Sequence, residues 1–235
     1  MKILIKQAKI IDSSSKHNNK ICDILINDNK IEKIAKKIQI DSDTKIFKSD
    51  NIHISQGWFD IHVNFGQPGF EHRETIENGL NVAAKGGFTE VLLMPNTKPC
   101  IDNSSMIDFI KSFDKKHIVN IQVAGNLTIS QEGKNIVEVN DMIDNGCIAF
   151  TDDKKSIQNN ELMKIALLYL KNSNALLMNF PNDEKIQNRG VINEGKVSTE
   201  LGLKGIPNIA EKMMLDRDIS LCKYTESKIH ESYIS

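Results

Sequence analysis

The sequence has little of what would indicate a membrane, secreted or nucleic-acid-binding protein. Lysine plus arginine (30) nearly balances aspartate plus glutamate (31), so the formal net charge is −1 and gives no electrostatic attraction for nucleic acid or an anionic membrane. No apolar run approaches the ~20 residues that span a bilayer. The N-terminus interleaves lysines with apolar residues and has no small-residue cleavage site, which argues against a signal peptide.

Cysteine is also scarce, and its spacing excludes two common uses. The four cysteines, at positions 22, 100, 147 and 222, are far apart and contain no C-x-x-C pair. We therefore expect reduced thiols in a reducing compartment, and together with the missing leader this predicts a cytoplasmic protein. The remaining composition, 40% hydrophobic and 26% charged over 235 residues, is that of a globular chain long enough for a sizeable core.

Residues 1–55 read as a separate, β-rich unit. Residues 2–11 alternate partly between apolar and polar, and two further apolar runs flank the turn signal Asn27-Asp28-Asn29-Lys30, which predicts a hairpin. We expect a small N-terminal β-sandwich subdomain here.

From residue 56 onward, predicted strands and helices alternate, which is typical of a parallel α/β barrel. The helix over 71–85 should end at Gly86-Gly87, which we read as a helix stop and not as a phosphate loop. The first expected strand ends near residue 62, and the later ones cover 90–94, 119–124, 147–150, 175–178 and 229–235. The other expected helices cover 103–113, 135–144, 160–169, 198–201 and 209–217. The fold class is therefore α/β, a partial TIM-type (β/α) barrel with about six of eight units over 56–235.

The stretch 56–102 contains the most informative pattern. Alternate residues of a strand face the same way, so Asp60, His62 and Asn64 are expected to point together. An H-x-H pair at such a strand end would present two imidazoles to a metal, and here the second imidazole is replaced by the Asn64 amide.

Several ordered motifs give the chain a resemblance to a known family. They are 57–63 (GWFDIHV), 67–71 (QPGFE), 86–89 (GGFT), 94–97 (MPNT), 149–153 (AFTDD) and 202–207 (GLKGIP). In order and spacing they resemble the dihydroorotases of the metal-dependent amidohydrolase superfamily, most closely the long-chain bacterial type. The resemblance implies a hydrolase of pyrimidine biosynthesis that interconverts dihydroorotate and carbamoyl-aspartate with zinc.

The resemblance also implies a set of metal ligands, and the chain keeps only part of it. His62 matches the first imidazole, and Asp152, with Asp153 as the alternative, matches the carboxylate after the fourth strand. Phe180 stands at the histidine position after the fifth strand and Tyr233 at the one after the sixth, although His230 is present nearby. An amide oxygen is a weaker zinc ligand than an imidazole, so we expect at most a weak mononuclear site.

The residues that bind the substrate in the family are also only partly kept. In the family an arginine after the first strand grips the substrate carboxylate, and Gly66 stands at that position; Asn96 matches the family's other carboxylate-binding residue. Plainer interpretations stay open: His62 as a hydrogen-bonded core histidine, Asp152 and Asp153 as capping residues, and Asn96 as a loop-stabilising side chain.

Two functional hypotheses follow. One is a dihydroorotase-like protein with a degraded metal site, no confident catalytic residue and little or no activity, which serves as a noncatalytic pathway subunit. The other is a functioning dihydroorotase with a reduced or altered metal centre. Expected partners are a small-molecule substrate if the chain is active, and another copy or a pyrimidine-pathway protein. Because only about six units are present, we also expect a truncated or split gene product, or a partner that completes the barrel.

Overall fold

The computed structural model describes residues 1–114 and 117–235 and divides into two compact units, Met1–Gly57 and Trp58–Ser235. The division falls two residues beyond the boundary that the sequence indicated. Each unit has its own sheet and its own core, and each is described by itself.

The N-terminal unit is one mixed sheet in the described residues. Its strands are β1 (Lys2–Ile11), β2 (Ile21–Asn27), β3 (Lys30–Ala35), β4 (Lys45–Phe47) and β5 (His53–Ser55). The order is β3-β2-β1-β4, and β5 pairs with the far end of β1. The predicted hairpin joins β2 and β3, where Asp28 and Asn29 both have positive φ (46° and 64°), as a two-residue turn of this twist needs.

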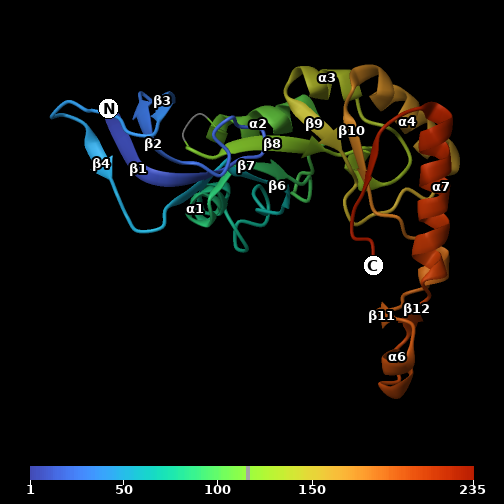
Figure 1. Ribbon diagram of the computed structural model, residues 1–235. Helices are drawn as coiled ribbons and strands as arrows, with labels where there is room; N and C mark the ends of the chain where they lie inside the picture. The colour runs from blue at the N-terminus through green and yellow to red at the C-terminus, as the bar shows by residue number, and fades with distance from the viewer. Residues whose placement is uncertain (115–116) are drawn as a thin grey trace. The chain divides into compact units, whose positions relative to one another are not determined.

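The second unit is built on a curled parallel sheet, with the helices on its outer side (Figure 1). Its order in the described residues is β13-β10-β9-β8-β7-β6. These strands are β6 (Trp58–Val63), β7 (Phe88–Leu93), β8 (Asn120–Gly125), β9 (Cys147–Phe150), β10 (Leu176–Asn179) and β13 (Ile229–Glu231). Six parallel strands in sequential order confirm the α/β fold with about six barrel units.

The helices that follow these strands cover the sheet and close the main core. They are α1 (Ile76–Gly86), α2 (Ser104–Asp114), α3 (Val139–Asp144), α4 (Asn160–Ser173) and α7 (Ile209–Thr225), and α4 packs beside α7. Apolar residues of the helices and strands meet in one cluster that includes Leu80, Ile107, Ile121, Phe150 and Leu167, all 1% exposed or less. Burial of this cluster holds the strand ends, and therefore the site, in place.

The first barrel helix starts later than the sequence predicted. It begins at Ile76 and not at residue 71, because the Thr75 hydroxyl caps it by accepting a hydrogen bond from the Asn78 N–H at 3.2 Å. Residues before Thr75 form turns instead. The helix ends as predicted, with Gly87 in the left-handed conformation at φ 86°.

Other boundaries also differ from the prediction. The α3 helix begins at Val139, not at 135, because Ile136 bridges back to Thr128 in an antiparallel pair. Strand β13 ends at Glu231, not at 235, since Tyr233 takes a positive φ of 60°. The sequence did not indicate η1 (Ile129–Gln131), α5 (Glu184–Gln187), β11 (Ile192–Asn193) or β12 (Gly205–Ile206). Strands β11 and β12 form a small lobe with α6 (Lys196–Glu200) beyond one end of α7 (Figure 1).

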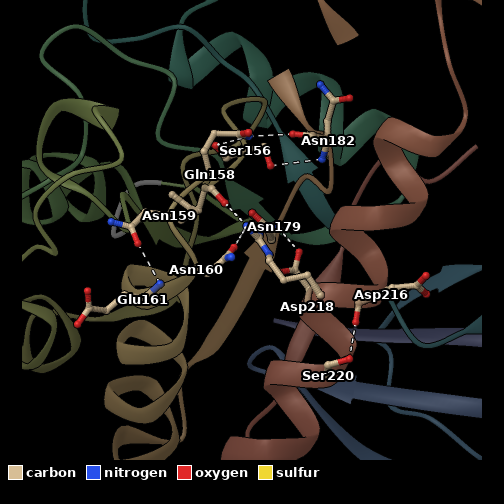
Figure 2. Close-up of polar contacts among 12 residues, drawn as sticks. Ser156, Gln158, Asn159, Asn160, Glu161, Asn179, Asn182, Asp216, Asp218 and Ser220 are labelled. Carbon is tan, nitrogen blue, oxygen red and sulfur yellow. Dashed lines mark hydrogen bonds and ion pairs between the residues drawn. The ribbon is translucent and has the colours of Figure 1, made fainter. Parts of the chain in front are cut away.

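A buried polar layer links β10 to α7 (Figure 2). The Asn179 amide donates to Asp218 at 2.8 Å, and the Arg217 guanidinium pairs with the other oxygen of Asp218 at 2.7 Å. Burial raises the pKa of Asp218, although Arg217 opposes the shift. On the neighbouring strand, burial and the nearby Asp218 raise the pKa of Glu231 to about 8. This pKa favours the protonated form of the Glu231 carboxyl at neutral pH.

Candidate functional site

The candidate site lies where several strands of the parallel sheet end. His62 is near the carboxyl end of β6 and Asn64 follows it, Asn96 follows β7, Asp153 follows β9, and Tyr233 follows β13. The carboxyl ends of parallel strands meet at one edge of such a sheet, which is where barrel folds place their sites. The fold thus brings together residues up to 171 positions apart in the sequence.

The site is centred on a contact among His62, Asp153 and Tyr233. The Tyr233 hydroxyl lies 2.6 Å from His62 Nε2 and donates to Asp153 Oδ1 at 3.1 Å. His62 Nε2 also lies 3.0 Å from the same carboxylate oxygen. The Asp153 side chain is 1% exposed, the His62 side chain is 23% exposed, and Tyr233 is 43% exposed. The phenol hydroxyl therefore contacts both the partly exposed imidazole and the buried carboxylate.

The second oxygen of Asp153 is also occupied. The Asn96 amide donates to Asp153 Oδ2 and to Asn64 Oδ1, the latter at 2.8 Å. Burial opposes ionisation of Asp153, but hydrogen bonds from His62 and Asn96 outweigh it and hold the pKa of this carboxyl below its usual value. Asp153 is therefore a carboxylate at neutral pH, with three side chains around it.

Asp152 has different surroundings from its neighbour. It is 4% exposed, and its Oδ1 accepts from the backbone N–H groups of Leu127 and Thr128, each at 3.0 Å. Its Oδ2 accepts from the Thr128 hydroxyl. Burial raises the pKa of Asp152, and the hydrogen bonds from Thr128 offset part of this rise. The carboxylate that faces His62 is that of Asp153, the alternative, whereas Asp152 ties the loop after β8 to the end of β9.

The turn between the two aspartates explains their opposite directions. The Asp153 N–H donates to the Thr151 hydroxyl at 2.8 Å, and Asp153 adopts a left-handed φ of 50°. Aspartate tolerates this conformation better than most residues with a Cβ atom. The turn sends the Asp152 side chain toward β8 and the Asp153 side chain toward β6.

The other positions singled out by the sequence also lie in or near the site. The Phe180 ring packs edge-on against Tyr233, with centroids 5.7 Å apart. Gly66 has φ +80°, and a Cβ atom there would lie 2.9 Å from the Phe70 carbonyl oxygen, so this backbone leaves no room for a side chain. His230 precedes Glu231 on β13 and pairs with Met178 of β10.

The family resemblance implies a zinc pair at this position. One imidazole and one carboxylate meet here, and both are bonded to Tyr233. Over residues 1–114 and 117–235, no three His, Cys, Asp or Glu side chains form a group able to hold a metal ion. A binuclear centre needs several imidazoles and a bridging carboxylate. These residues do not fit such a centre; weak binding of a single ion at His62 and Asp153 stays a prediction.

Sequence reasoning missed the cationic side chains of the site. A cavity of about 420 Å³ next to Asp153 is lined by Asn64, Asn96, Arg73, Lys154 and Lys155, among others. A helix over 71–85 would place Arg73 in its first turn, but α1 starts only at Ile76, so Arg73 lies in a loop that borders the cavity. One signal in the sequence could have indicated Arg73. Gly66 stands where the family has an arginine, so another cation nearby could take over its role.

Comparisons with solved structures show the class of fold. The L-hydantoinase (dihydropyrimidinase) from Arthrobacter aurescens aligns with a TM-score of 0.74 at 15% identity, over 97% of this chain and 52% of that one. At this identity the likeness concerns the fold alone, and it confirms the α/β barrel-type fold. No helix among the described residues has the length and apolar character needed to cross a membrane.

Comparisons of sequence are more specific. Residues 53–235 match the protein family described as "Dihydro-orotase-like". A dihydroorotase of Geobacter metallireducens is 36% identical and one of Pelotomaculum thermopropionicum 38% identical, each over 236 aligned residues that cover all of this chain and 55% of the relative. The chain belongs to the dihydroorotase-like family, which confirms the resemblance read from the motifs. It spans about half the length of the curated relatives it matches.

Proposed function

We propose that this chain is a dihydroorotase-like protein of pyrimidine biosynthesis whose metal-dependent hydrolysis has been lost. The observation that carries the proposal is the position of the Tyr233 hydroxyl, 2.6 Å from His62 and 3.1 Å from Asp153. These are the imidazole and the carboxylate that meet in the site, and the phenol hydroxyl contacts both. A zinc ion would have to displace it.

The chemistry of the reaction supports the same conclusion. Opening a cyclic amide ring at neutral pH needs a strong nucleophile, which the family resemblance attributes to metal-activated water. Loss of a mere supporting partner typically costs about 10–100-fold in metal affinity or activity. Here Asn64, Phe180 and Tyr233 replace three nitrogen donors, so we expect the combined loss to be larger.

What the remaining residues do is hold the strand ends together. Asp153 accepts hydrogen bonds from residues that follow β7 and β13 and contacts His62 of β6. This hydrogen-bonded cluster joins the ends of these strands, as a bound metal ion would. It also leaves the adjacent cavity available for a small ligand, which is consistent with a noncatalytic role beside another pathway protein.

A functioning dihydroorotase with one weakly held metal is the second candidate. The 3.0 Å approach of His62 Nε2 to Asp153 favours it, because an imidazole and a carboxylate at this distance can share a cation after Tyr233 rotates away. Such an enzyme would need zinc in excess, and Tyr233→Phe would raise its metal affinity by removing the competing hydroxyl.

The test is a turnover assay with dihydroorotate and with carbamoyl-aspartate, run with added zinc and with EDTA. The proposal expects rates indistinguishable from the protein-free control in both. The Asp153→Asn variant serves as the matched control for zinc-dependent turnover. Turnover that requires zinc and disappears in Asp153→Asn would overturn the proposal and establish the second candidate.

A further inference from the structure

A pair of buried carboxyl groups lies at the start of the segment that carries Tyr233. Asp218 of α7 is 0% exposed, and both carboxyl oxygens of Glu231, the last residue of β13, are buried. In the register of the sheet Glu231 pairs with Asn179 of β10, whose amide donates to Asp218 at 2.8 Å (Figure 2). The two acids therefore belong to one polar layer between the sheet and α7.

This layer holds one cation for two acids. From α7, Arg217 and Asp218 face Glu231, and the Arg217 guanidinium pairs with Asp218 at 2.7 Å. On β13 itself, His230 adjoins Glu231. The β10 residues that pair with β13 carry no charge; they are Leu177, Met178 and Asn179. Burial and the neighbouring Asp218 raise the pKa of Glu231 to about 8.

The residues after β13 connect this layer to the candidate site. The Ser232 N–H donates to the Asn179 carbonyl at 2.8 Å, next to Glu231 in the chain. Tyr233 then turns with a positive φ of 60°, and its hydroxyl lies 2.6 Å from His62 Nε2 and donates to Asp153 at 3.1 Å. A movement of β13 would therefore move the phenol that contacts the imidazole and the carboxylate.

The segment 229–235 has few contacts that would hold it without the buried acids. Strand β13 has only three residues, and Tyr233 and Ile234 are 43% and 52% exposed. The Ser235 N–H and hydroxyl donate to Glu211 of α7 at 3.1 and 3.0 Å, in a contact exposed to solvent. Segments with little buried apolar surface open locally at a small cost in free energy.

We infer that Glu231 and Asp218 form a pH-operated latch for residues 229–235, which is closed while the two acids hold a proton and opens, with release of Tyr233 from His62 and Asp153, when that proton passes to solvent. In the closed form the Glu231 O–H donates to the Asp218 carboxylate. Without the proton, two buried carboxylates share one guanidinium, which is unfavourable. Opening brings Glu231 into water and removes this repulsion.

The direction of the effect follows from the two forms. Glu231 has a pKa of about 8 in the closed form and, once solvated, its usual value of 4.5. The closed form therefore has its full advantage below pH 4.5. Between these two pKa values the equilibrium constant for opening should rise about tenfold per pH unit, and above the higher one it should level off.

Hydrogen exchange of the Ser232 amide tests the latch in the full chain, in buffer with EDTA. Exchange of a free amide already rises about tenfold per pH unit, so the Ser232 rate should rise about 100-fold per unit between about pH 5.5 and 7.5. The amide of Ile121, a residue 0% exposed in the main core, should exchange far more slowly than that of Ser232 at every pH. That difference identifies the opening as local.

Variants identify the group that titrates. Glu231→Gln keeps the shape of the protonated acid and cannot ionise, so its Ser232 amide should follow only the tenfold dependence of a free amide. The matched control is Glu77→Gln, an exposed glutamate of α1, which should keep the steep dependence. Thermal melts show whether each variant is folded.

A second readout follows the site itself. Diethyl pyrocarbonate modifies neutral imidazoles, and the exposed His72 provides a reference within the same chain. His62 Nε2 is in contact with Tyr233 and Asp153 in the closed form, so its modification requires release of Tyr233. From about pH 6.5 to 8, the ratio of the His62 rate to the His72 rate should rise about tenfold more in the wild type than in Glu231→Gln.

The inference is wrong if Ser232 in the wild type follows only the tenfold dependence, if Glu231→Gln keeps the steep one, or if Ser232 exchanges no faster than Ile121. Equal His62 ratios in the wild type and Glu231→Gln would show that Tyr233 is not released, and would overturn it as well. These measurements use neither turnover nor zinc. The latch and the proposed function can therefore fail independently.

Discussion

The two adjacent aspartates should respond very differently to substitution, and Asp152→Ala is the sharper test. Asp152 Oδ1 is the acceptor for two backbone N–H groups, those of Leu127 and Thr128, both buried. Removing the carboxylate leaves both donors without a partner in a place that water does not readily reach. Each buried, unsatisfied donor costs about 1–3 kcal/mol.

The expected magnitude follows from these two groups. Two orphaned donors would lower the free energy of unfolding by about 2–6 kcal/mol. Because removing a buried charge also recovers some of its desolvation cost, which here raises the pKa of Asp152, we expect about 2–4 kcal/mol. Asp152→Asn keeps an oxygen in place for the two N–H groups, so its loss should be smaller than that of Asp152→Ala.

Urea unfolding followed by circular dichroism measures these differences. The control is Asp144→Ala, an exposed aspartate at the end of α3, which should change stability by less than about 0.5 kcal/mol. If Asp152→Ala were as mild as Asp144→Ala, the assignment of Asp152 to loop anchoring would be wrong. A metal role for this residue would then regain support.

Three further predictions concern other parts of the second unit. Thr75→Ala should lower stability by about 1 kcal/mol through loss of the α1 cap to Asn78, and Thr75→Ser should restore most of it. Glu231 has a pKa raised from 4.5 to about 8, so its contribution to stability is fully present below pH 4.5 and is lost as pH rises toward 8. Glu231→Gln should therefore make stability depend less on pH between these values. An unchanged slope would argue against a buried, protonated Glu231. The double variant Asn64→His, Phe180→His should stay without measurable dihydroorotate turnover, since Tyr233 still occupies the site; restored turnover would contradict this.

The sequence predicted the barrel well because its signals are local. Apolar runs of strand length, each followed by a polar tip, located the strands to within a few residues, and Gly87 ended α1 where expected. The start of α1 was less predictable, because residues 71–74 have helix-compatible side chains and only the Thr75 cap decides between helix and turn.

The site was harder to predict because its contacts are long-range. Tyr233 read as the loss of a ligand, and nothing local indicates that its hydroxyl bonds to His62, 171 residues away. Similarly, adjacent aspartates look equivalent in the sequence, and the left-handed turn at Asp153 decides which of them faces the site. The residue types at these positions were therefore readable from the sequence, whereas the hydrogen bonds among their side chains were not.

The central claim is that Tyr233, His62 and Asp153 form a metal-free hydrogen-bonded cluster where a zinc pair would lie. The most direct measurement is the zinc content, by elemental analysis, of protein produced with excess zinc and then desalted. The account predicts no stoichiometric zinc in the wild-type chain. Two zinc ions per chain, retained through desalting and lost in Asp153→Asn, would contradict it.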